Sequence, residues 1–598
     1  MALRKSSGAA LRGPTLGAGG WCPVFLVLAA IWPSSAAVAQ TPPRPQNPPP
    51  PVASPIDRLA PVTPPSLSPS LEPPPLVPQT GPGEAQRIRI NQVILPQSDT
   101  VPAAALRPAV EGLAGSTVAL AQIEQARLAL LRIWRDAGYP FAAVNAAVTP
   151  TPDGADLRFT VIEGYIAEVK LEGDIGPAGT QVLRFLNPLV EERPLTGAAL
   201  ERALLLASDV AGVSVHGVLR PVPGEPGALE LVAQLSRRPF GGYFTVDNRA
   251  YELTGPAQAL AAISANSFTS LGERTELAIY QAESDTQRFG QLAEEAFIGG
   301  SGLKIRLYAG IGRARPNGSL AQAGYAGSTR VFGGALTYPI IRSRPRNLNV
   351  SVALDALESE VKQGFAPNQA RQSYDSVRVL RIGLDGSLLE NLITFLPQAR
   401  TIGALHLSHG LEAFGATRSD STTAGRPGSD FDFQKINLDV TRTQPLFLLD
   451  DATSLSLQLA AAAQWSDDVL PSSEKFYFGG NRLGRGYYSG QVTGDRAIGT
   501  SLELQVDRQF EIPDTPFGPL EIASQFYAFR DFGRSFENNT DPNRRISSYG
   551  LGVRLTLNET YQLELEGVKR VSRRVDAGAD TLPKLNEQAV YTRFLARF

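Results

Sequence analysis

From about residue 238 to the end of the chain, apolar and polar residues alternate with a period of two. Within 500–507, for example, Leu502, Leu504 and Val506 share one face of an extended strand, and the polar residues between them share the other. The alternation recurs around Leu277, Leu438, Leu455 and Leu563, and no helical period interrupts it over about 360 residues. Apolar residues facing lipid and polar residues facing a wet interior are typical of membrane barrels. The pattern therefore predicts a transmembrane antiparallel β-barrel over residues 238–598.

The last strand of this region gives a more specific sign. Alternate residues from Val590 to the terminal Phe598 share one face, whereas Arg593 and Arg597 share the other. In a dry core each arginine would need a partner to offset several kcal/mol of desolvation, while in a wet lumen it needs none. A chain that ends in Phe on its lipid face resembles the recognition signal of bacterial outer-membrane barrels. This resemblance implies that Phe598 is a C-terminal barrel signal, with the barrel-assembly machinery as a partner during biogenesis.

Ahead of the barrel, the periodicity predicts two small α/β domains, at 87–164 and 165–237. In the first, apolar residues recur at helical spacing from Ile123 to Ala137, between two strand-like segments. In the second, Thr196 is expected to cap a helix, and strand-like segments lie on both sides of that helix.

The N-terminus has the order of a secretory signal peptide. The basic residues Arg4 and Lys5 precede an apolar run at 24–31, and small residues end at Ala39. We therefore expect a signal peptide over 1–39. Cys22, the only cysteine, lies within it, so the mature chain has no cysteine for a disulfide.

The next segment, 40–86, is dominated by proline. Between Thr41 and Gly83, 17 of 43 residues are proline. Such a composition favours an extended tether and disfavours a packed core, so we expect a disordered linker here.

Composition and motifs exclude several classes of function. The formal net charge is −2 and the basic residues are spread out, so no nucleic acid partner is expected. The chain has three histidines, and His406 and His409 would point to opposite faces of a strand, so they predict no metal site. Nucleotide-binding, metalloprotease and nucleophile-elbow motifs are absent from the sequence. We expect no catalytic residues, no cofactor and no enzyme activity.

Two short motifs carry the candidate site. Four glycines lie between 479 and 486, around Arg485, so the backbone can turn tightly and approach other segments closely. The second motif, Phe529-Arg530-Asp531-Phe532-Gly533, begins 44 residues after Arg485, at the end of a strand-like run. The alternation of that run points Asp531 inward. We expect Arg485 and Asp531 to form an ion pair in the lumen.

These motifs resemble the outer-membrane transporters of two-partner secretion, the hemolysin secretion/activation (TpsB) class, within the superfamily of the barrel-assembly insertase. The resemblance implies two periplasmic POTRA domains followed by a barrel of about 16 strands with an inserted extracellular loop; by length alone, fourteen or eighteen strands would also fit. It assigns Arg485, Gly486 and Tyr487 to the inserted-loop motif, Asp531 to its barrel-wall partner, and Phe529 and Gly533 to the strand motif. The family usually has a branched aliphatic residue where this chain has Gly484.

The resemblance also implies a function and a location. The protein would lie in the bacterial outer membrane, in contact with its lipid, and its POTRA domains would capture an unfolded TpsA-type exoprotein for passage through the barrel. Some relatives carry an N-terminal helix that plugs the pore. Here the best candidate, 56–59, lies between Pro55 and Pro61 and has room for one turn, so we expect the plug to be absent or vestigial.

Two other functions stay open from the sequence. A barrel-assembly insertase would share the loop motif, although two POTRA domains and a proline tether favour a dedicated transporter. A passive porin or uptake channel would share the barrel, but it would have no need of the domains at 87–237.

Overall fold

The structure is a computed structural model that describes residues 55–56, 60, 87–513, 519–575 and 584–598. The expected signal peptide and nearly all of the expected linker lie outside the described residues.

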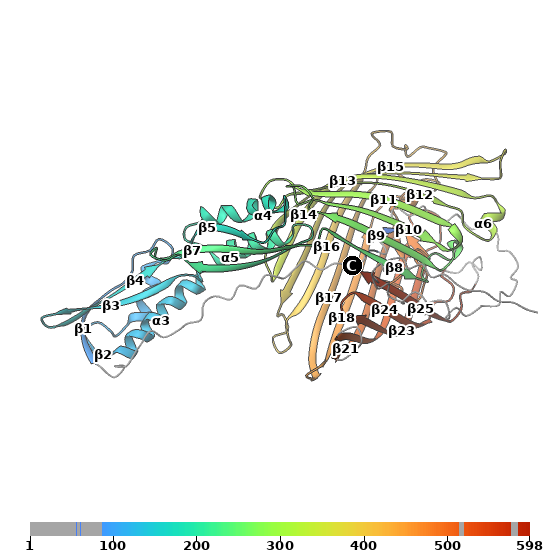
Figure 1. Cartoon of the computed structure of the whole chain (residues 1–598). Coiled ribbons are helices and arrows are strands. Elements are labelled where there is room, and N and C mark those ends of the chain that lie inside the picture. The colour runs from blue at the N-terminus through green and yellow to red at the C-terminus, as the bar shows by residue number, and fades with distance from the viewer. Residues whose placement is uncertain (1–54, 57–59, 61–86, 514–518, 576–583) are drawn as a thin grey trace, which may run out of the picture. The chain divides into compact units, whose positions relative to one another are not determined.

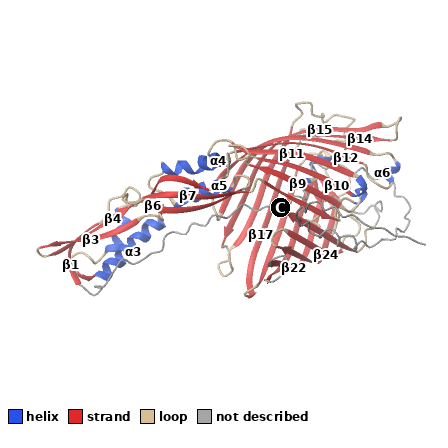
Figure 2. Cartoon of the chain, viewed as in Figure 1, coloured by secondary structure: helices blue, strands red, loops and turns tan. Residues whose placement is uncertain are grey.

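The first α/β domain is a four-stranded sheet covered by one long helix (Figure 2). The sheet order is β2-β1-β4-β3. Trp134 and Leu130 of the long helix are fully buried against Phe159 of the sheet, as the helical spacing predicts. The elements are β1 (Arg87–Ile94), α2 (Ala103–Leu106), η2 (Arg107–Val110), β2 (Thr117–Ala119), α3 (Leu120–Asp136), β3 (Ala143–Thr151) and β4 (Gly154–Ile162).

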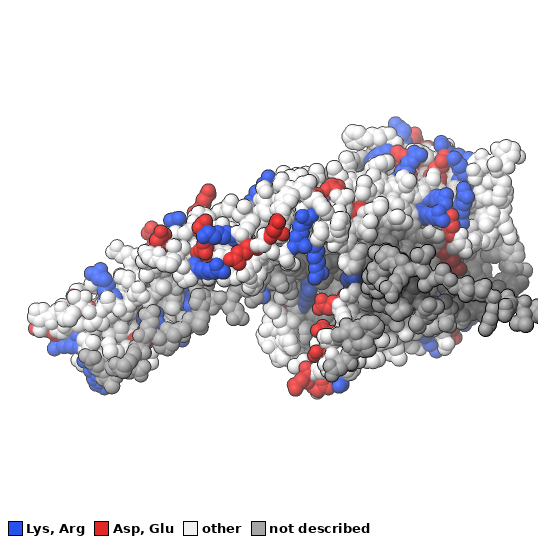
Figure 3. Space-filling view, in the orientation of Figure 1, with Lys and Arg blue, Asp and Glu red and all other residues white. Residues whose placement is uncertain are grey.

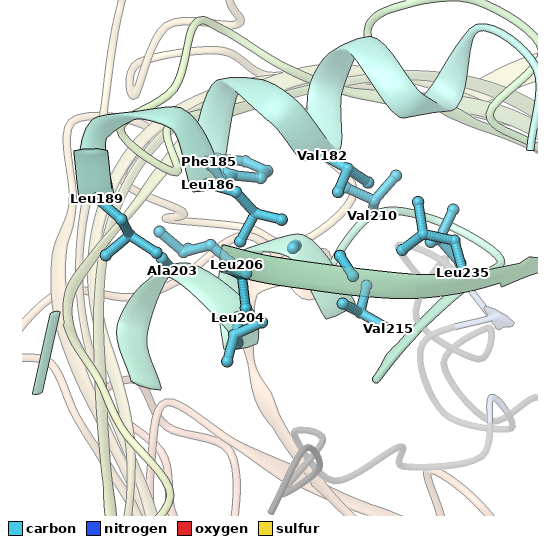
Figure 4. Packing of buried hydrophobic residues seen from close by; sticks show 14 of the residues in the cluster. Val182, Phe185, Leu186, Leu189, Ala203, Leu204, Leu206, Val210, Val215 and Leu235 are labelled. Carbon is cyan, nitrogen blue, oxygen red and sulfur yellow. The ribbon is translucent and has the colours of Figure 1, made fainter. Parts of the chain in front are cut away.

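The second α/β domain has a three-stranded sheet, ordered β5-β7-β6, and two main helices. Thr196 caps the second of these helices, because its hydroxyl accepts a hydrogen bond from the Ala199 amide at 3.1 Å. The core packs Phe185 and Leu204 from the two helices against Leu235 (Figure 4). The elements are β5 (Tyr165–Glu172), α4 (Ala178–Leu186), η3 (Asn187–Val190), α5 (Gly197–Ser208), β6 (Val213–Pro221) and β7 (Ala228–Arg237). None of the described helices is long and apolar enough to cross a membrane.

The rest of the chain forms one closed barrel, which confirms the predicted fold class and its sixteen strands (Figure 1). All neighbouring strands are antiparallel, and β25 closes the barrel by pairing with β8. The strands are β8 (Phe240–Asp247), β9 (Gln258–Asn266), β10 (Arg274–Ala282), β11 (Gln287–Phe297), β12 (Lys304–Ala314), β13 (Ala326–Arg342), β14 (Arg346–Gln363), β15 (Ala370–Glu390), β16 (Ala399–Gly410), β17 (Gln434–Asp450), β18 (Thr453–Trp465), β21 (Arg496–Ile512), β22 (Leu520–Phe536), β23 (Arg544–Leu557), β24 (Tyr561–Arg570) and β25 (Gln588–Arg597). Closure leaves no strand edge exposed to lipid, where an unpaired backbone group would be costly.

Side chains alternate between the two faces of the barrel wall as the sequence predicts. Leu502 and Leu504 of β21 are exposed on the outside, whereas Glu503 between them is buried inside. The terminal Phe598 also faces outward, with 70% of its surface exposed. In the space-filling view, charged side chains gather at the ends of the barrel strands, and much of the wall between them is uncharged (Figure 3).

One end of the barrel contacts the second α/β domain. Arg342, at the end of β13, forms an ion pair with Asp209, and Arg202 of α5 donates a hydrogen bond to the Pro339 carbonyl at 2.9 Å. Phe297, at the end of β11, belongs to the core cluster of that domain. The long connection at 466–495, between β18 and β21, leaves from the opposite end and contains η6 (Ser472–Glu474), β19 (Phe476–Phe478) and β20 (Val492–Gly494).

Only residues 55, 56 and 60 are described near the expected plug position. The Ala60 amide donates a hydrogen bond to the Ile56 carbonyl at 2.8 Å, and residues 57–59 lie outside the described residues. Ile56 is buried in one cluster with barrel residues such as Leu260 and Tyr280, and with Phe433. The sequence did not predict the burial of Ile56.

The first domain contains a carboxylate that links three of its segments. Glu163 accepts hydrogen bonds from the Ser98 hydroxyl at 2.7 Å, from the Thr100 hydroxyl, and from the Trp134 indole at 3.3 Å. Burial alone would raise the pKa of Glu163, but these hydrogen bonds outweigh it and hold the pKa below its ordinary value of 4.5.

This lowered pKa predicts acid sensitivity of the first domain. A carboxyl whose pKa is lowered by folding stabilises the fold above its unfolded pKa, and this contribution disappears as the pH falls through the folded pKa. We therefore expect the free energy of unfolding of a fragment of residues 87–237 to decrease below about pH 4.5. Unfolding can be measured by the fluorescence of Trp134, the only tryptophan in this fragment. Glu163→Gln should flatten that pH dependence, whereas the exposed control Glu111→Gln should leave it unchanged. If stability depended on pH in the same way in both variants, Glu163 would not be the source of the acid sensitivity.

Candidate functional site in the barrel lumen

The loop at 466–495 turns back on itself at its glycines. The Gly479 amide donates to the Leu483 carbonyl and the Gly480 amide to the Tyr487 carbonyl, both at 3.0 Å. Gly479 has a φ of +100° and faces the Tyr488 carbonyl so closely that a Cβ would collide with it. Only glycine satisfies both conditions. The turn presents Arg485 to the barrel wall.

The structure brings Arg485 and Asp531 together. The Arg485 backbone amide donates to Asp531 Oδ2 at 2.7 Å, and its guanidinium Nη2 donates to Oδ1 at 3.1 Å. Arg485 is 3% exposed and Asp531 is fully buried. Because one carboxylate binds both the backbone and the side chain of Arg485, it fixes the position of the loop tip as well as its charge.

Two further wall residues complete the surroundings of the guanidinium. Nη1 is paired with Glu503, and Nη2 also donates to the Ser501 hydroxyl at 2.8 Å. The ring of Phe529 lies beneath the guanidinium, 3.6 Å from its carbon to the ring centroid, in a cation–π contact. The sequence motif identified Phe529 and Asp531 but missed Ser501 and Glu503. The strand alternation already turned both of these residues inward, and Ser501 pairs directly with Asp531 in the β-ladder.

Further buried charges surround the loop tip. Arg554 pairs with Glu503 at 2.7 Å and with Glu564 at 3.2 Å. Arg249 pairs with Glu566 at 2.7 Å and donates to the carbonyls of Gly480 and Arg485. Arg570, which donates to the Gly486 carbonyl, lies beside them. The arginines of this region are residues 249, 485, 554 and 570, and the carboxylates that pair with the first three are residues 503, 531, 564 and 566. We call these eight residues, with Ser501, the luminal network. Its members come from the loop and from both ends of the barrel sequence, so sequence order alone could not group them.

The residues after Arg485 are held by their backbone and by one buried ring. The Gly486 carbonyl accepts hydrogen bonds from Arg570 and from the Tyr591 hydroxyl, and a Cβ on Gly486 would lie 2.6 Å from the Cβ of Ser548. Tyr487 is fully buried, and its hydroxyl lies 2.7 Å from the Ser572 carbonyl. Each of the predicted loop residues thus contacts the wall rather than solvent.

The departure from the family at Gly484 has a local cause. Gly484 has a φ of +77°, and a Cβ there would collide with Ile546 of β23. Gly533 of the strand motif lies under the same cluster, where a Cβ would be 2.8 Å from the ring of Phe478. The volume near the tip is therefore filled by Ile546 and Phe478, and both glycines are required by close approach.

The two ends of the loop are fixed by a second set of charges at the rim opposite the α/β domains. Arg426, from the connection between β16 and β17, binds both oxygens of Asp495 at 2.6 and 2.9 Å and also pairs with Glu537. Burial alone would raise the pKa of Asp495, but Arg426 and two backbone amides hold it below its ordinary value. Near the start of the loop, Glu474 pairs with Arg381 and Lys435. No motif in the sequence predicted this set of charges.

The remaining predicted residue lies outside the lumen. Phe598 exchanges backbone hydrogen bonds with Gly242 of β8 at 2.9 and 3.1 Å, so it adds to the seam that closes the barrel. Over the described part of the chain, no group of three or more His, Cys, Asp or Glu side chains is placed to hold a metal ion.

Comparisons with known proteins agree on one family. The family model described as haemolysin secretion/activation protein ShlB/FhaC/HecB matches residues 228–555, more than half of the chain. The chain is also similar to the heme/hemopexin transporter protein HuxB of Haemophilus influenzae, with 20% identity over 475 residues that cover 77% of this chain and 80% of the relative.

Two solved structures share the fold. CdiB from Escherichia coli is 17% identical, with a TM-score of 0.65 over 88% of this chain and 94% of that one. CdiB from Acinetobacter baumannii is also 17% identical, with a TM-score of 0.58 over 91% of this chain and 95% of that one.

The luminal network predicts unequal effects of two substitutions in the loop. Arg485→Gln leaves Asp531 and Glu503 buried without a full partner, so we expect a loss of about 3–5 kcal/mol of stability and faster proteolysis of 466–495. Arg482→Gln is the matched control, because Arg482 is 47% exposed and pairs with Asp439 in an open part of the lumen, where such a contact is worth at most about 1 kcal/mol. The stability of the inserted barrel is measured by its heat modifiability on SDS gels, and the exposure of the loop is measured by protease mapping. Equal behaviour of the two variants would show that the network does not hold the loop.

Proposed function

The chain belongs to the haemolysin secretion/activation family ShlB/FhaC/HecB, and we propose that it secretes one unfolded exoprotein by binding it in the periplasm and threading it through the barrel. The protein is an outer-membrane transporter of two-partner secretion with periplasmic POTRA domains. Members of this class serve a secreted partner of the TpsA type.

The luminal network is the observation that carries the proposal. A barrel of sixteen strands is wide enough to enclose an aqueous channel. Here the loop at 466–495 enters that space and is tied through Arg485 to β21 and β22. The loop also pairs with β15 and β17, through Glu474 and Arg482, so it is held along the inner wall at several places. A loop held along the wall leaves more of the channel to an extended chain than a loop detached from Arg485 onward. We therefore assign to Arg485 and Asp531 the role of an anchor that keeps the path open.

Client binding is best supported at the edge of the second POTRA sheet. The Arg238 amide donates to the Gly212 carbonyl, which fixes the alternation of hydrogen-bonded pairs between β6 and β7. By that alternation, the amides of Val215, Gly217 and Leu219 point away from β7. No other described strand pairs with this edge of β6. An extended client can add there as a strand, through backbone hydrogen bonds that make few demands on its sequence.

The sequence contains no nucleotide-binding motif, so we propose that the client itself supplies the driving force for its export. Folding of the exoprotein outside the cell removes the unfolded chain from the equilibrium and makes its return unfavourable.

Deletion of the gene tests the function directly. We expect one large exoprotein to disappear from the medium while the other outer-membrane barrels keep their abundance, measured by quantitative proteomics of both fractions. A general fall in outer-membrane barrels would identify an assembly factor instead, and no change in either fraction would identify a channel.

Complementation of the deletion strain tests the role of single residues. The Arg482→Ala variant should restore secretion, and the Arg485→Ala variant should restore it several-fold less at equal barrel insertion. Equal secretion by the two variants would refute the anchoring role of Arg485.

The proposed binding edge predicts a pattern of crosslinks. A photo-crosslinking residue at Ser214 or His216, both exposed on β6, should capture the client during secretion. The control position is Lys170 on β5, which is exposed at the opposite edge of the same sheet. We expect client adducts from the β6 positions only. Adducts of equal yield from β5, or adducts from neither strand while secretion proceeds, would place the client elsewhere.

A further inference from the structure

Four arginines gather on the outer face of the barrel, at the end away from the POTRA domains. They lie on three neighbouring strands, with one on β21, two on β22 and one on β23. We call them the outer arginine cluster: Arg496, Arg530, Arg534 and Arg545. Their outward direction follows from the ladder, because Arg530 pairs with Leu502 and Arg534 pairs with Ile498, and both of these apolar residues are exposed on the outer face.

The ladder places like charges opposite each other. Arg534 of β22 is the direct partner of Arg545 of β23. Directly opposed like charges destabilise an antiparallel sheet unless something of opposite charge binds them. Arg530 lies four residues below Arg534, about 13 Å along the strand. It sits just above the apolar row that includes Leu504 and Leu551, and exposed apolar residues such as Ile498 lie beside the cluster, so the cluster lies in the upper part of the apolar wall.

No protein carboxylate neutralises this cluster. Among the described residues, none of the four arginines forms an ion pair or donates a side-chain hydrogen bond, and Arg496 has a buried Nε without an acceptor. The outward arginines at the same end of other strands differ in this respect. Arg313 pairs with Asp285 at 3.0 Å, and Arg371 pairs with Glu360 at 2.6 Å. The missing anion is therefore a local property of β21–β23.

Aromatic rings surround the cluster. Arg534 lies over the ring of Phe536 at 4.7 Å, and Arg496 lies over the ring of Trp465 at 5.1 Å. Tyr549 is the ladder partner of Arg530. Aromatic residues are typical of the level where lipid headgroups meet the acyl chains. An unpaired arginine on a lipid-facing wall is destabilising to a degree that depends on depth, which favours a bound anion at this level.

We propose that the outer arginine cluster is a binding site for the phosphate groups of lipopolysaccharide, the phosphorylated glycolipid of the outer leaflet. Charge complementarity is the first reason, because several guanidiniums without a protein partner match a phosphorylated sugar through paired N–H donors. Position is the second. The cluster continues the lipid-facing wall upward at the end opposite Arg342 and the POTRA contact, so the lipid beside it belongs to the outer leaflet. Leu504 and Leu551, which are exposed on the wall below Arg530, offer apolar surface to the acyl chains below the phosphates.

The site lies on the opposite face of the strands that carry the anchor. Arg530 precedes Asp531 on β22, and Arg496 follows Asp495, which binds Arg426. A lipid bound across β21, β22 and β23 therefore stiffens the wall to which the loop is tied.

Lipid titration of the full chain tests the proposal. The protein is reconstituted in nanodiscs of neutral phosphatidylcholine and titrated with lipid A, with dephosphorylated lipid A, or with phosphatidylglycerol. We expect the unmodified protein to bind lipid A in preference to both other lipids. Arg530→Gln combined with Arg534→Gln and Arg545→Gln should weaken lipid A binding by roughly two orders of magnitude, at about a factor of five for each arginine.

The control variant combines Arg313→Gln with Arg371→Gln, which removes outward arginines that already have a carboxylate partner. It should bind lipid A as the unmodified protein does, and heat-modified migration should show that both variants are folded. Equal binding of lipid A and its dephosphorylated form by the unmodified protein would overturn the proposal, and this comparison needs no variant. Equal loss in the control variant, or equal binding of phosphatidylglycerol, would also overturn the assignment to the glycolipid.

Discussion

A buried guanidinium is stable only where its charge is matched and its N–H groups have acceptors. Arg485 meets this condition inside the barrel, where Asp531, Glu503 and the Ser501 hydroxyl occupy its donors and Phe529 covers its face. None of these partners belongs to the loop. The loop can therefore adopt its observed position only when β21 and β22 are already paired in their observed register. The ionic network thus makes the order of the loop depend on the order of the wall.

The backbone of the loop depends on the same wall. Arg249 and Arg570, which belong to the network, also donate to carbonyl groups at 480, 485 and 486. A carbonyl that accepts from a charged donor in a dry interior is bound more firmly than one in water. The close contacts at Gly484 and Gly486 complete this arrangement, because a side chain at either position would push the tip away from β23. Charge and the absence of side chains therefore act together at one site.

The sequence predicted the parts of this structure that depend on local rules. Period-two alternation identified the barrel, turned Asp531 inward and placed Phe598 on the outer face, since each of these follows from neighbouring residues. The resemblance supplied the count of sixteen strands. What the sequence missed depends on distant contacts: Arg249 meets Glu566 across 317 residues, and neither is part of a motif. Helix α4, at Ala178–Leu186, was also missed, because its nine residues are too few for a clear helical period.

The lipid on one face of strand β22 and the lumen on its other face both constrain the register in which the strand pairs. Arg530 and Arg534 face outward, while Asp531 between them faces the lumen. A slip of one residue would reverse every side chain of the strand. It would then place Arg530 beside Arg485, with two guanidiniums in a dry site, and would turn Asp531 toward lipid, where it would have no partner. Both faces of the strand therefore disfavour the slipped pairing, the inner face through the anchor and the outer face through the membrane. The alternation of basic and acidic residues in Phe529-Arg530-Asp531 thus specifies the register that the anchor requires.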